Sequence, residues 1–315
     1  MFVSSNDKIV ISTMGWIEHG GIWIYNVENK KYITHNLSDA KYLQLHEGKN
    51  GFFSLLHFYD GNKLNISLHH EDDPPNIIDT IVIEGTGNNY KFKSDLWSNV
   101  PLFYTTFLNR LSGNDFYLLK INLATKDVYI SFLDWYDESY DKGYQGVVQV
   151  IQSITSNDEV IFSIQRSSEL IVYNVENNVV TRKVELAGKH GNPMLKYGQN
   201  KELWALDYDT IVKIDSNTYE CIVSALLQPP KNGMGQFCGE YVFNKTQTCC
   251  LVSRPFSNDA VCLNTKNLKI ERKVELNNEP LEVALIENDF VIARSWKTGK
   301  LITGKLQKVG LFNKI

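Results

Sequence analysis

Ser5-Asn6-Asp7-Lys8-Ile9-Val10-Ile11-Ser12 is matched later in the chain by Ser156-Asn157-Asp158-Glu159-Val160-Ile161-Phe162-Ser163. Each copy is followed by the same pentapeptide, Tyr25-Asn26-Val27-Glu28-Asn29 in the first and Tyr173-Asn174-Val175-Glu176-Asn177 in the second. A further pentapeptide, Arg182-Lys183-Val184-Glu185-Leu186, recurs as Arg272-Lys273-Val274-Glu275-Leu276. Such literal recurrence at a distance indicates copies of one structural unit.

The repeated unit has the pattern of four short β-strands. Val, Ile, Tyr, Phe and Thr dominate runs of about five to nine residues, and polar or glycine-containing turns separate these runs. In the first copy we expect strands at 2–5, 8–13, 21–27 and 31–36. The second copy contains the step Asp60-Gly61, which favours a two-residue hairpin turn. The unit is therefore predicted to be a four-stranded antiparallel meander.

About seven such units span the 315 residues, which gives roughly 45 residues each, within the range of propeller blades. A lone meander leaves both faces open, whereas radial stacking buries each blade against its neighbours. The sequence therefore predicts an all-β fold, a single β-propeller domain over residues 1–315, with six or eight blades as alternatives. The expected blades are approximately 1–39, 40–85, 86–136, 137–186, 187–227, 228–276 and 277–315.

By period and strand pattern, the chain resembles β-propeller repeat proteins of the WD-repeat and YVTN-like class over nearly its whole length. The Trp-Asp dipeptide that would end a WD blade is absent, and the Gly-His step does not recur at regular spacing. No residue of a specific family motif is matched. The resemblance therefore implies a fold and carries no family function with it.

Residues 101–111 offer a helical alternative. Pro101 stands at a plausible first helical position, and Phe103, Phe107 and Leu111 follow a helical spacing. Residues 113–115 lead into the strand that begins at Phe116 in the same way as residues 61–63 lead into the strand that begins at Leu64. Because of this repeated pattern, we expect residues 101–111 to form a strand and not a helix.

Composition excludes several classes of partner. With 43% hydrophobic and 22% charged residues the chain can bury a core, and a net charge of -4 gives no attraction to nucleic acid or anionic membranes. Residues 1–7 lack a signal-peptide pattern, and no apolar run is long enough to span a bilayer. We expect a cytoplasmic protein whose five cysteines are reduced thiols.

A binding surface is expected on the face where connections between blades meet turns between second and third strands. The long connections at 85–99, 135–146, 187–193 and 228–236, with the turn at 15–21, are rich in aromatic residues. Exposed Tyr and Trp are typical of interaction hot spots on loops. The candidate partner-binding residues are Trp16, His19, Tyr90, Trp97, Trp135, Tyr136, Asp137, Glu138, Tyr140, Asp141, Tyr144 and His190.

The segment 135–141 combines three aromatic residues with three carboxylates, which suits a partner with a basic surface. Two other interpretations stay open: the rings could plug a central channel or cover blade edges, and the acids could form a solvated loop. Replacing Trp135, Tyr136 and Tyr140 by Ala is expected to abolish binding without lowering thermal stability.

No catalytic, metal or cofactor site is expected. The sequence lacks a nucleophile elbow, a zinc-protease motif and a phosphate-binding glycine loop. His69 and His70 are adjacent, so on a strand they point apart, and the acids that follow lie in a proline-containing turn. The sequence therefore favours a non-enzymatic protein-interaction propeller, in one form an inhibitor or immunity-type protein. The alternative is a propeller with an axial pocket for a small molecule or glycan, or a lactonase- or lyase-like enzyme. The oligomeric state stays open.

Overall fold

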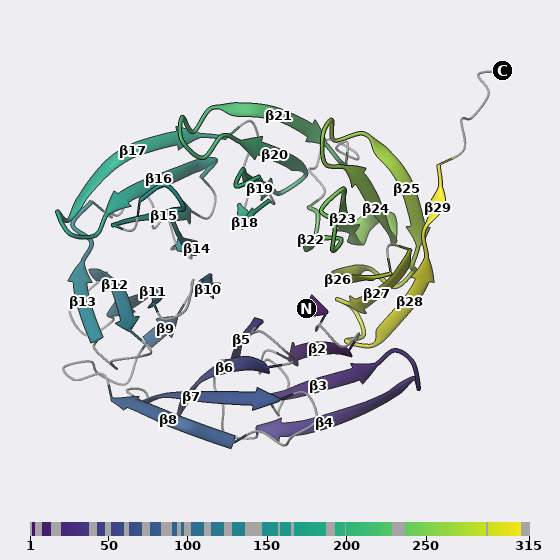
Figure 1. Cartoon of the computed structure of the whole chain (residues 1–315), viewed down its shortest axis with the longest axis horizontal. Coiled ribbons are helices and arrows are strands. Elements are labelled where there is room, and N and C mark those ends of the chain that lie inside the picture. Colours follow the sequence, from purple (N-terminus) through teal and green to yellow (C-terminus); the bar gives the residue numbers. More distant parts are fainter. Residues whose placement is uncertain are drawn as a thin grey trace. The chain divides into compact units, whose positions relative to one another are not determined.

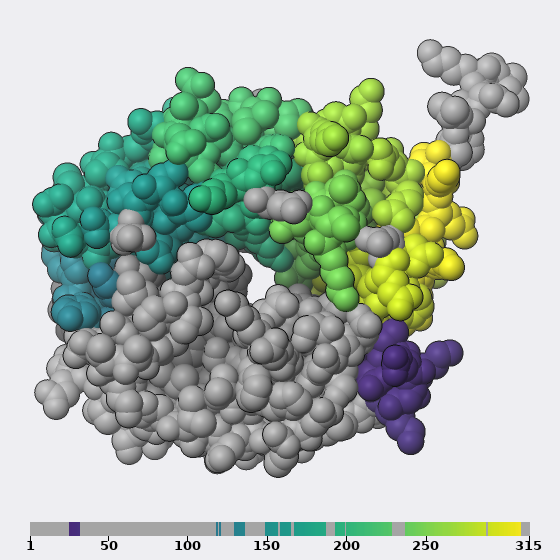
Figure 2. All heavy atoms as spheres, viewed as in Figure 1, coloured from purple at the N-terminus to yellow at the C-terminus, as the bar shows by residue number. Residues whose placement is uncertain are grey.

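The structure is a computed structural model of the chain, drawn in Figure 1. It describes the backbone of residues 2–3, 8–13, 20–37, 43–47, 52–59, 63–70, 76–82, 90–92, 96–97, 102–109, 115–122, 128–135, 147–156, 158–164, 167–186, 193–198, 200–228, 237–287 and 289–309. Side chains are described at 25–31, 118, 120 and 129–135 and, within these ranges, from 149 onward. Figure 2 shows these residues in colour.

The chain divides into two compact units. One comprises residues 1–164 and 171–183, and the other comprises residues 165–170 and 184–315. The single domain expected from the repeats stays a prediction.

All described elements are β-strands apart from one short 3-10 turn, η1 (Pro255–Ser257). The predicted all-β class is therefore confirmed. The segment with a helical alternative is a strand, β11 (Leu102–Asn109), which pairs with β12 (Asp115–Asn122) along its whole length. Repeated hairpin pairing outweighs the helical spacing in this segment.

The first unit contains three four-stranded antiparallel sheets. The first sheet has the order β1 (Phe2–Val3), β2 (Lys8–Thr13), β3 (Gly20–Asn26), β4 (Lys31–Leu37). The second has the order β5 (Leu43–Glu47), β6 (Phe52–Tyr59), β7 (Lys63–His70), β8 (Asn76–Val82). The third has the order β13 (Val128–Phe132), β12, β11, β9 (Tyr90–Phe92).

The fourth sheet contains a strand that the repeat did not predict. Its order is β10 (Leu96–Trp97), β14 (Val147–Gln152), β15 (Glu159–Ile164), β16 (Glu169–Asn174), β17 (Val179–Glu185). β10 pairs in parallel with β14, although about 50 residues separate them in sequence. The connection expected at 85–99 thus contains β9 and β10, and it is not an uninterrupted loop.

The second unit contains the remaining sheets. The fifth sheet has the order β18 (Met194–Tyr197), β19 (Leu203–Asp207), β20 (Thr210–Ile214), β21 (Cys221–Leu226). The sixth has the order β22 (Tyr241–Phe243), β23 (Cys249–Arg254), β24 (Asp259–Asn264), β25 (Ile270–Glu275), β29 (Gln307–Lys308). The seventh has the order β26 (Pro280–Ile286), β27 (Phe290–Ser295), β28 (Leu301–Lys305).

The sheets fall within the predicted blade boundaries except at two strands. β10 joins the fourth sheet from within the range expected for the third, and β29 pairs with β25 of the sixth sheet from within the range expected for the last. The end of the last expected blade, residues 310–315, lies outside the described residues. The number of blades in the chain stays a prediction.

The repeated pentapeptide encodes one hairpin turn. The Asn26 Oδ1 accepts hydrogen bonds from the backbone N–H groups of Glu28 and Asn29, and Lys30 takes a left-handed conformation with φ of 56°. Asn174 and Asn178 hold the equivalent places, with φ of 57° at Asn178. The side-chain oxygen replaces a backbone partner within the turn, which is why Asn is favoured at its first position.

The same turn recurs where the sequence has diverged. In each turn the residue in the left-handed conformation lies four places after the first position. The three pairs are Asp215 with Tyr219, Asn264 with Leu268, and Ser295 with Gly299. In each of these turns the N–H of the left-handed residue donates to the carbonyl of the first residue, at 2.8, 2.8 and 3.0 Å. The backbone conformation is thus repeated more widely than the residues that form it.

The core of the second unit lies on both faces of the sixth sheet. Trp204, Tyr241, Cys250 and Val252 belong to a cluster between the fifth and sixth sheets. Cys249 and Leu251 belong to a second cluster, with residues of the seventh sheet. The adjacent Cys249 and Cys250 therefore point to opposite faces, as strand geometry requires.

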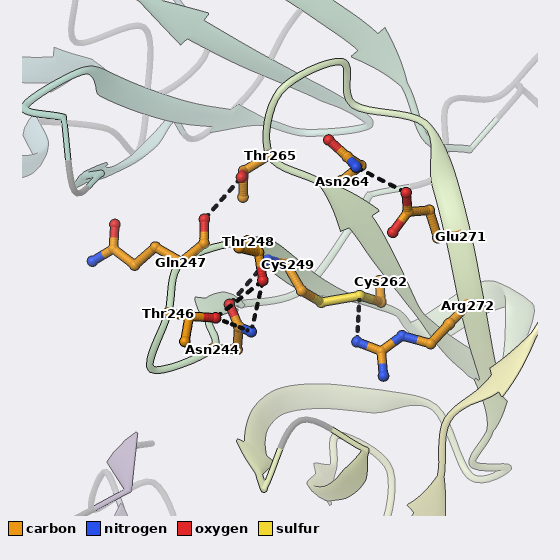
Figure 3. The surroundings of a disulfide bond; sticks show 10 residues. All are labelled: Asn244, Thr246, Gln247, Thr248, Cys249, Cys262, Asn264, Thr265, Glu271 and Arg272. Atoms are coloured by element: carbon orange, nitrogen blue, oxygen red, sulfur yellow. Dashed lines mark hydrogen bonds between the residues drawn. A yellow bond between two sulfur atoms is a disulfide. The ribbon is translucent and has the colours of Figure 1, made fainter.

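Cys249 and Cys262 form a disulfide between β23 and β24, with 5.9 Å between their Cα atoms (Figure 3). Cys262 lies opposite Leu251, so its partner is the residue two places along the neighbouring strand. The Arg272 guanidinium donates to the Cys262 sulfur at 3.3 Å. The expectation that all five cysteines are reduced is therefore wrong for this pair, while Cys221, Cys238 and Cys250 are free thiols.

Candidate functional site

Four aromatic side chains of the second unit gather at one place, and we refer to them as the aromatic cluster. Tyr208 lies in the turn between β19 and β20, and Phe237 lies on the connection that leads into β22. Phe256 is in η1 between β23 and β24, and Trp296 follows β27. Each of three successive sheets thus contributes one ring from the turn after its second strand, and a connection between sheets contributes the fourth.

Phe237 is the centre of the aromatic cluster. Its ring centroid lies 5.1 Å from that of Phe256 and 5.1 Å from that of Trp296, with interplanar angles of 85° and 70°. Tyr208 approaches it at 6.1 Å in a tilted arrangement. Edge-to-face contacts of this kind are favourable for aromatic rings and fix their relative orientation.

The outer rings of the aromatic cluster are open to solvent. Phe256 is 50% exposed and Trp296 is 54% exposed, whereas Phe237 and Tyr208 are half-buried. Single exposed apolar residues are common on protein surfaces, but neighbouring exposed aromatic rings are typical of interaction sites.

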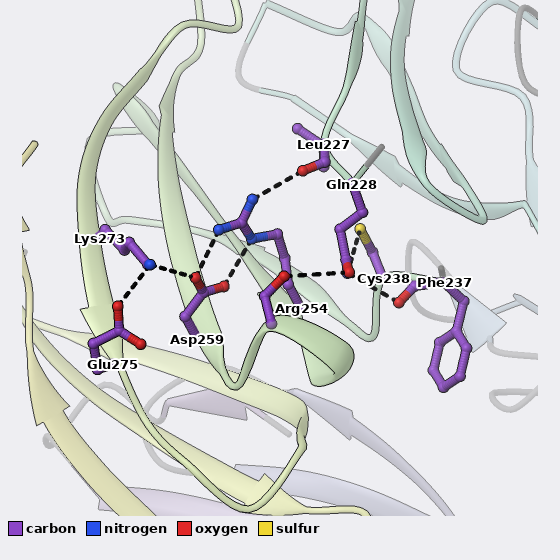
Figure 4. A network of polar contacts seen from close by, with 9 residues as sticks. Leu227, Gln228, Phe237, Cys238, Arg254, Asp259, Lys273 and Glu275 are labelled. Carbon is purple, nitrogen blue, oxygen red and sulfur yellow. Dashed lines mark hydrogen bonds and ion pairs between the residues drawn. The ribbon is translucent and has the colours of Figure 1, made fainter. Parts of the chain in front are cut away.

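An ion-pair network holds the turn that carries Phe256 (Figure 4). Arg254 and Asp259 stand at its two ends, and the guanidinium donates two hydrogen bonds to the Asp259 carboxylate at 2.7 and 2.6 Å. The Lys273 ammonium group lies 2.9 Å from the same Asp259 carboxylate and 2.6 Å from the carboxylate of Glu275. Asp259 is 1% exposed, so its ion pair with Arg254 lies where solvent screening is weak.

The same network reaches the segment that carries Phe237. Arg254 also donates to the Leu227 carbonyl at 2.9 Å, and the buried Gln228 donates to the Phe237 carbonyl at 3.1 Å. The N–H of Cys238 donates to the Tyr208 carbonyl at 2.6 Å. In Figure 4 the Phe237 ring points away from these polar groups. The peptide group between Phe237 and Cys238 is therefore held at both its carbonyl and its N–H, while the ring itself is left for other contacts.

Asn258 connects the turn of Phe256 to Trp296. It takes a left-handed conformation, and its Oδ1 accepts a hydrogen bond from the N–H of Glu279 at 2.9 Å. The Glu279 carbonyl in turn accepts from the N–H of Trp296 at 2.9 Å. The backbone that carries Trp296 is thus joined to the turn of Phe256 by hydrogen bonds, and a segment that is already ordered loses little freedom on binding.

Gly239 and Cys238, which follow Phe237 in the chain, contribute to packing beside the aromatic cluster. A Cβ at Gly239 would lie 2.9 Å from the Leu281 carbonyl carbon, so only glycine allows this close approach of the two segments. Burial raises the pKa of the Cys238 thiol to about 12, and the thiol stays protonated. A buried, protonated thiol is a poor nucleophile, so Cys238 contributes packing here.

Most residues expected at a partner-binding face lie outside the described part of the chain. These are Trp16, His19, Tyr136, Asp137, Glu138, Tyr140, Asp141, Tyr144 and His190. Tyr90 and Trp97 lie on β9 and β10, which corrects their placement in a loop. Their role in binding stays a prediction.

Trp135 packs against the core of the first unit. Its ring lies 5.3 Å from that of Phe162 and 6.2 Å from that of Tyr173, both of which are fully buried. These contacts match the interpretation in which the ring covers a blade edge. From this packing we expect truncation of Trp135 to lower stability, in contrast to the expectation from the sequence.

The sequence analysis did not identify the aromatic cluster. Its members stand singly in four separate segments, so none of these segments is aromatic-rich by itself. The four segments are nevertheless of the two kinds expected to carry a binding surface: connections between sheets and turns after second strands. Aligning these turns across the sheets would have shown one ring in each.

Within the ranges given above, no group of three or more His, Cys, Asp or Glu residues is arranged to hold a metal ion. No described helix is long and apolar enough to cross a membrane.

Comparison with solved structures identifies the fold. The chain is similar to a chain of the mitotic checkpoint complex, with a TM-score of 0.64, 8% identity and coverage of 96% of this chain and 85% of that one. It is also similar to the β-propeller domain of Cps50 (Swd1) from Myceliophteria thermophila, with a TM-score of 0.64, 13% identity and coverage of 98% and 96%.

A protein of unknown function from Bacteroides caccae matches with a TM-score of 0.55, 11% identity and coverage of 82% and 90%. No model of a known protein family matches the sequence, and no curated protein matches it. The chain thus has the β-propeller fold, as its period and strand pattern predicted.

Proposed function

Given its β-propeller fold, we propose that this chain is a non-enzymatic interaction protein that binds a partner protein through the aromatic cluster. The observation that carries the proposal is the pair of exposed rings, Phe256 and Trp296, that pack edge to face on Phe237. An inhibitor or immunity-type role is one form of such binding and rests on the same surface.

Aromatic rings that are already fixed gain contact area on binding at little entropic cost, which is why Trp and Tyr dominate interaction hot spots. The hydrogen bonds at Asn258, Gln228 and Arg254 supply that pre-organisation. One structural neighbour is a chain of a protein complex, which is a likeness of fold that adds support to a protein partner. No specific observation among the described residues favours an axial-pocket enzyme.

Affinity capture from native extract with three forms of the protein tests the proposal. The forms are wild type, the double variant Phe256→Ala/Trp296→Ala, and the control Ile222→Ala. Ile222 is 51% exposed on β21, so it matches the exposure of the two rings but lies outside the aromatic cluster. We expect a partner that wild type and control both retain and that the double variant loses. A partner retained equally by all three forms contradicts the proposal.

A further inference from the structure

The aromatic cluster presents π-faces in more than one direction. Phe256 and Trp296 stand at 85° and 70° to the central Phe237, so their faces are not parallel to its face. The face of an aromatic ring carries negative electrostatic potential and attracts a cation within about 6 Å, with Trp the strongest of the rings. Apolar contact alone does not use this property.

The ionic groups beneath the aromatic cluster neutralise one another. Arg254 and Lys273 both contact the Asp259 carboxylate, and Lys273 also contacts Glu275. Two cations therefore face two anions. Glu240, on the segment that follows Phe237, pairs with Lys196 at 3.4 Å. These groups contribute little net charge to the surface above them.

Among the described residues, the remaining charged neighbours of the ring-bearing residues are mainly acidic. Asp209 is adjacent in sequence to Tyr208, and its carboxylate accepts one hydrogen bond, from the Thr210 hydroxyl at 2.8 Å. The backbone carbonyl of Glu279 accepts a hydrogen bond from the backbone N–H of Trp296. Among the described residues neither carboxylate has an ion pair, and the opposing cation is the exposed Lys297, next to Trp296. Two residues with carboxylates and one with an ammonium group are thus neighbours, in sequence or through a backbone hydrogen bond, of residues that carry the rings.

We propose that the aromatic cluster accepts an arginine side chain of the partner protein, with the guanidinium against the exposed rings and the Asp209 and Glu279 carboxylates supplying complementary charge. Arginine fits better than lysine, because its planar and weakly hydrated guanidinium stacks on aromatic faces. This inference rests on the proposed function and specifies the chemistry of its ligand.

A displayed library of random peptides, selected on the full chain, provides the probe. Peptides are kept for analysis when they bind wild type and Ile222→Ala but not Phe256→Ala/Trp296→Ala. In each such peptide every arginine is then replaced by citrulline, which has nearly the same shape without the charge. We expect these peptides to contain arginine, and citrulline to weaken binding by roughly 2- to 30-fold, the range for a cation on an aromatic face.

Two single variants test whether removing a negative or a positive charge changes peptide binding in opposite directions. Asp209→Asn keeps an oxygen for the Thr210 hydroxyl but removes the charge, and it is expected to weaken binding of the arginine peptides by roughly 2- to 5-fold. Lys297→Gln removes the opposing cation and is expected to strengthen binding. A merely structural disturbance would weaken binding in both variants.

The outcomes separate this inference from the proposed function. Peptides that require the aromatic cluster but lack arginine, or that tolerate citrulline, overturn the arginine inference and leave the proposed function standing. Weaker binding in both single variants likewise overturns it. Recovery of no peptide that depends on Phe256 and Trp296 contradicts the inference and the proposed function together.

Discussion

Arg254 and Asp259 close the turn that carries Phe256, because the guanidinium donates to both carboxylate oxygens across the four intervening residues. The Asp259 side chain is 1% exposed and that of Arg254 is 14% exposed, so neither charge is well hydrated. This pair therefore links the stability of the sixth sheet to the placement of the aromatic cluster.

Replacing Asp259 by Ala should lower the free energy of unfolding by about 3–5 kcal/mol, because Arg254 is left as a poorly hydrated charge without its partner. Chemical denaturation of purified protein measures the change. Glu275→Gln is the control, since Glu275 is 64% exposed and its ion pair should contribute less than about 1 kcal/mol. Equal, small losses in both variants would show that the buried pair does not hold the turn.

Trp135→Ala should destabilise the protein by about 3 kcal/mol, because its ring packs on Phe162 and Tyr173 in the core of the first unit. Tyr129 is 57% exposed, so Tyr129→Ala serves as the control, with an expected change below about 1 kcal/mol. Thermal unfolding of both variants measures these losses of stability. If Trp135→Ala left stability unchanged, the ring would be available for a partner, as the sequence analysis expected.

The disulfide between Cys249 and Cys262 predicts three alkylatable thiols in the unfolded, unreduced protein and five after reduction. Mass spectrometry after iodoacetamide treatment counts them. Closing a loop of this length should stabilise the fold by about 3 kcal/mol, which the variant Cys249→Ser/Cys262→Ser would lose. Alkylation of all five cysteines without reductant would rule out the bridge.

Glu202 provides a prediction of pH dependence. Burial alone would raise the pKa of its carboxyl group, but hydrogen bonds from Lys213 and Asn200 outweigh this effect and hold the pKa below its ordinary value of 4.5. A lowered pKa contributes stability that is present above the unfolded-state pKa and is lost as the pH falls through the folded-state pKa.

The variant Glu202→Gln should therefore be less stable than wild type near pH 7, and the difference should shrink as the pH falls below 4.5. Denaturation curves across this pH range measure the effect. A difference that stays constant with pH would mean that the ionised carboxylate does not contribute to stability.

Local pattern was enough to predict most of the strands, though not β9 and β10, and identical residues were enough to expose the repeat. The turn at Asn26 and Lys30 could be matched to that at Asn174 and Asn178 because the residues are the same. The equivalent turn ending at Tyr219 could not be matched, because the same backbone can be formed by different residues.

Non-local contacts escaped prediction for a different physical reason. The two-residue strand β10 exists through its parallel pairing with β14, and no local signal marks such a partner. The aromatic cluster is likewise assembled from four distant segments, with Tyr208 and Trp296 at its extremes in sequence. The kinds of connection that hold the aromatic cluster were among those singled out in the sequence, whereas the rings that meet there could not be predicted.

The most direct test of the proposed function is the dissociation constant of the captured partner for wild type, Ile222→Ala and Phe256→Ala/Trp296→Ala, measured by calorimetry on samples with equal melting temperatures. Loss of an aromatic hot spot costs about 2 kcal/mol or more, so the double variant should bind at least about 30-fold more weakly, while the control stays near wild type. A double variant that binds within about 3-fold of wild type would contradict the assignment of the aromatic cluster as the partner-binding site.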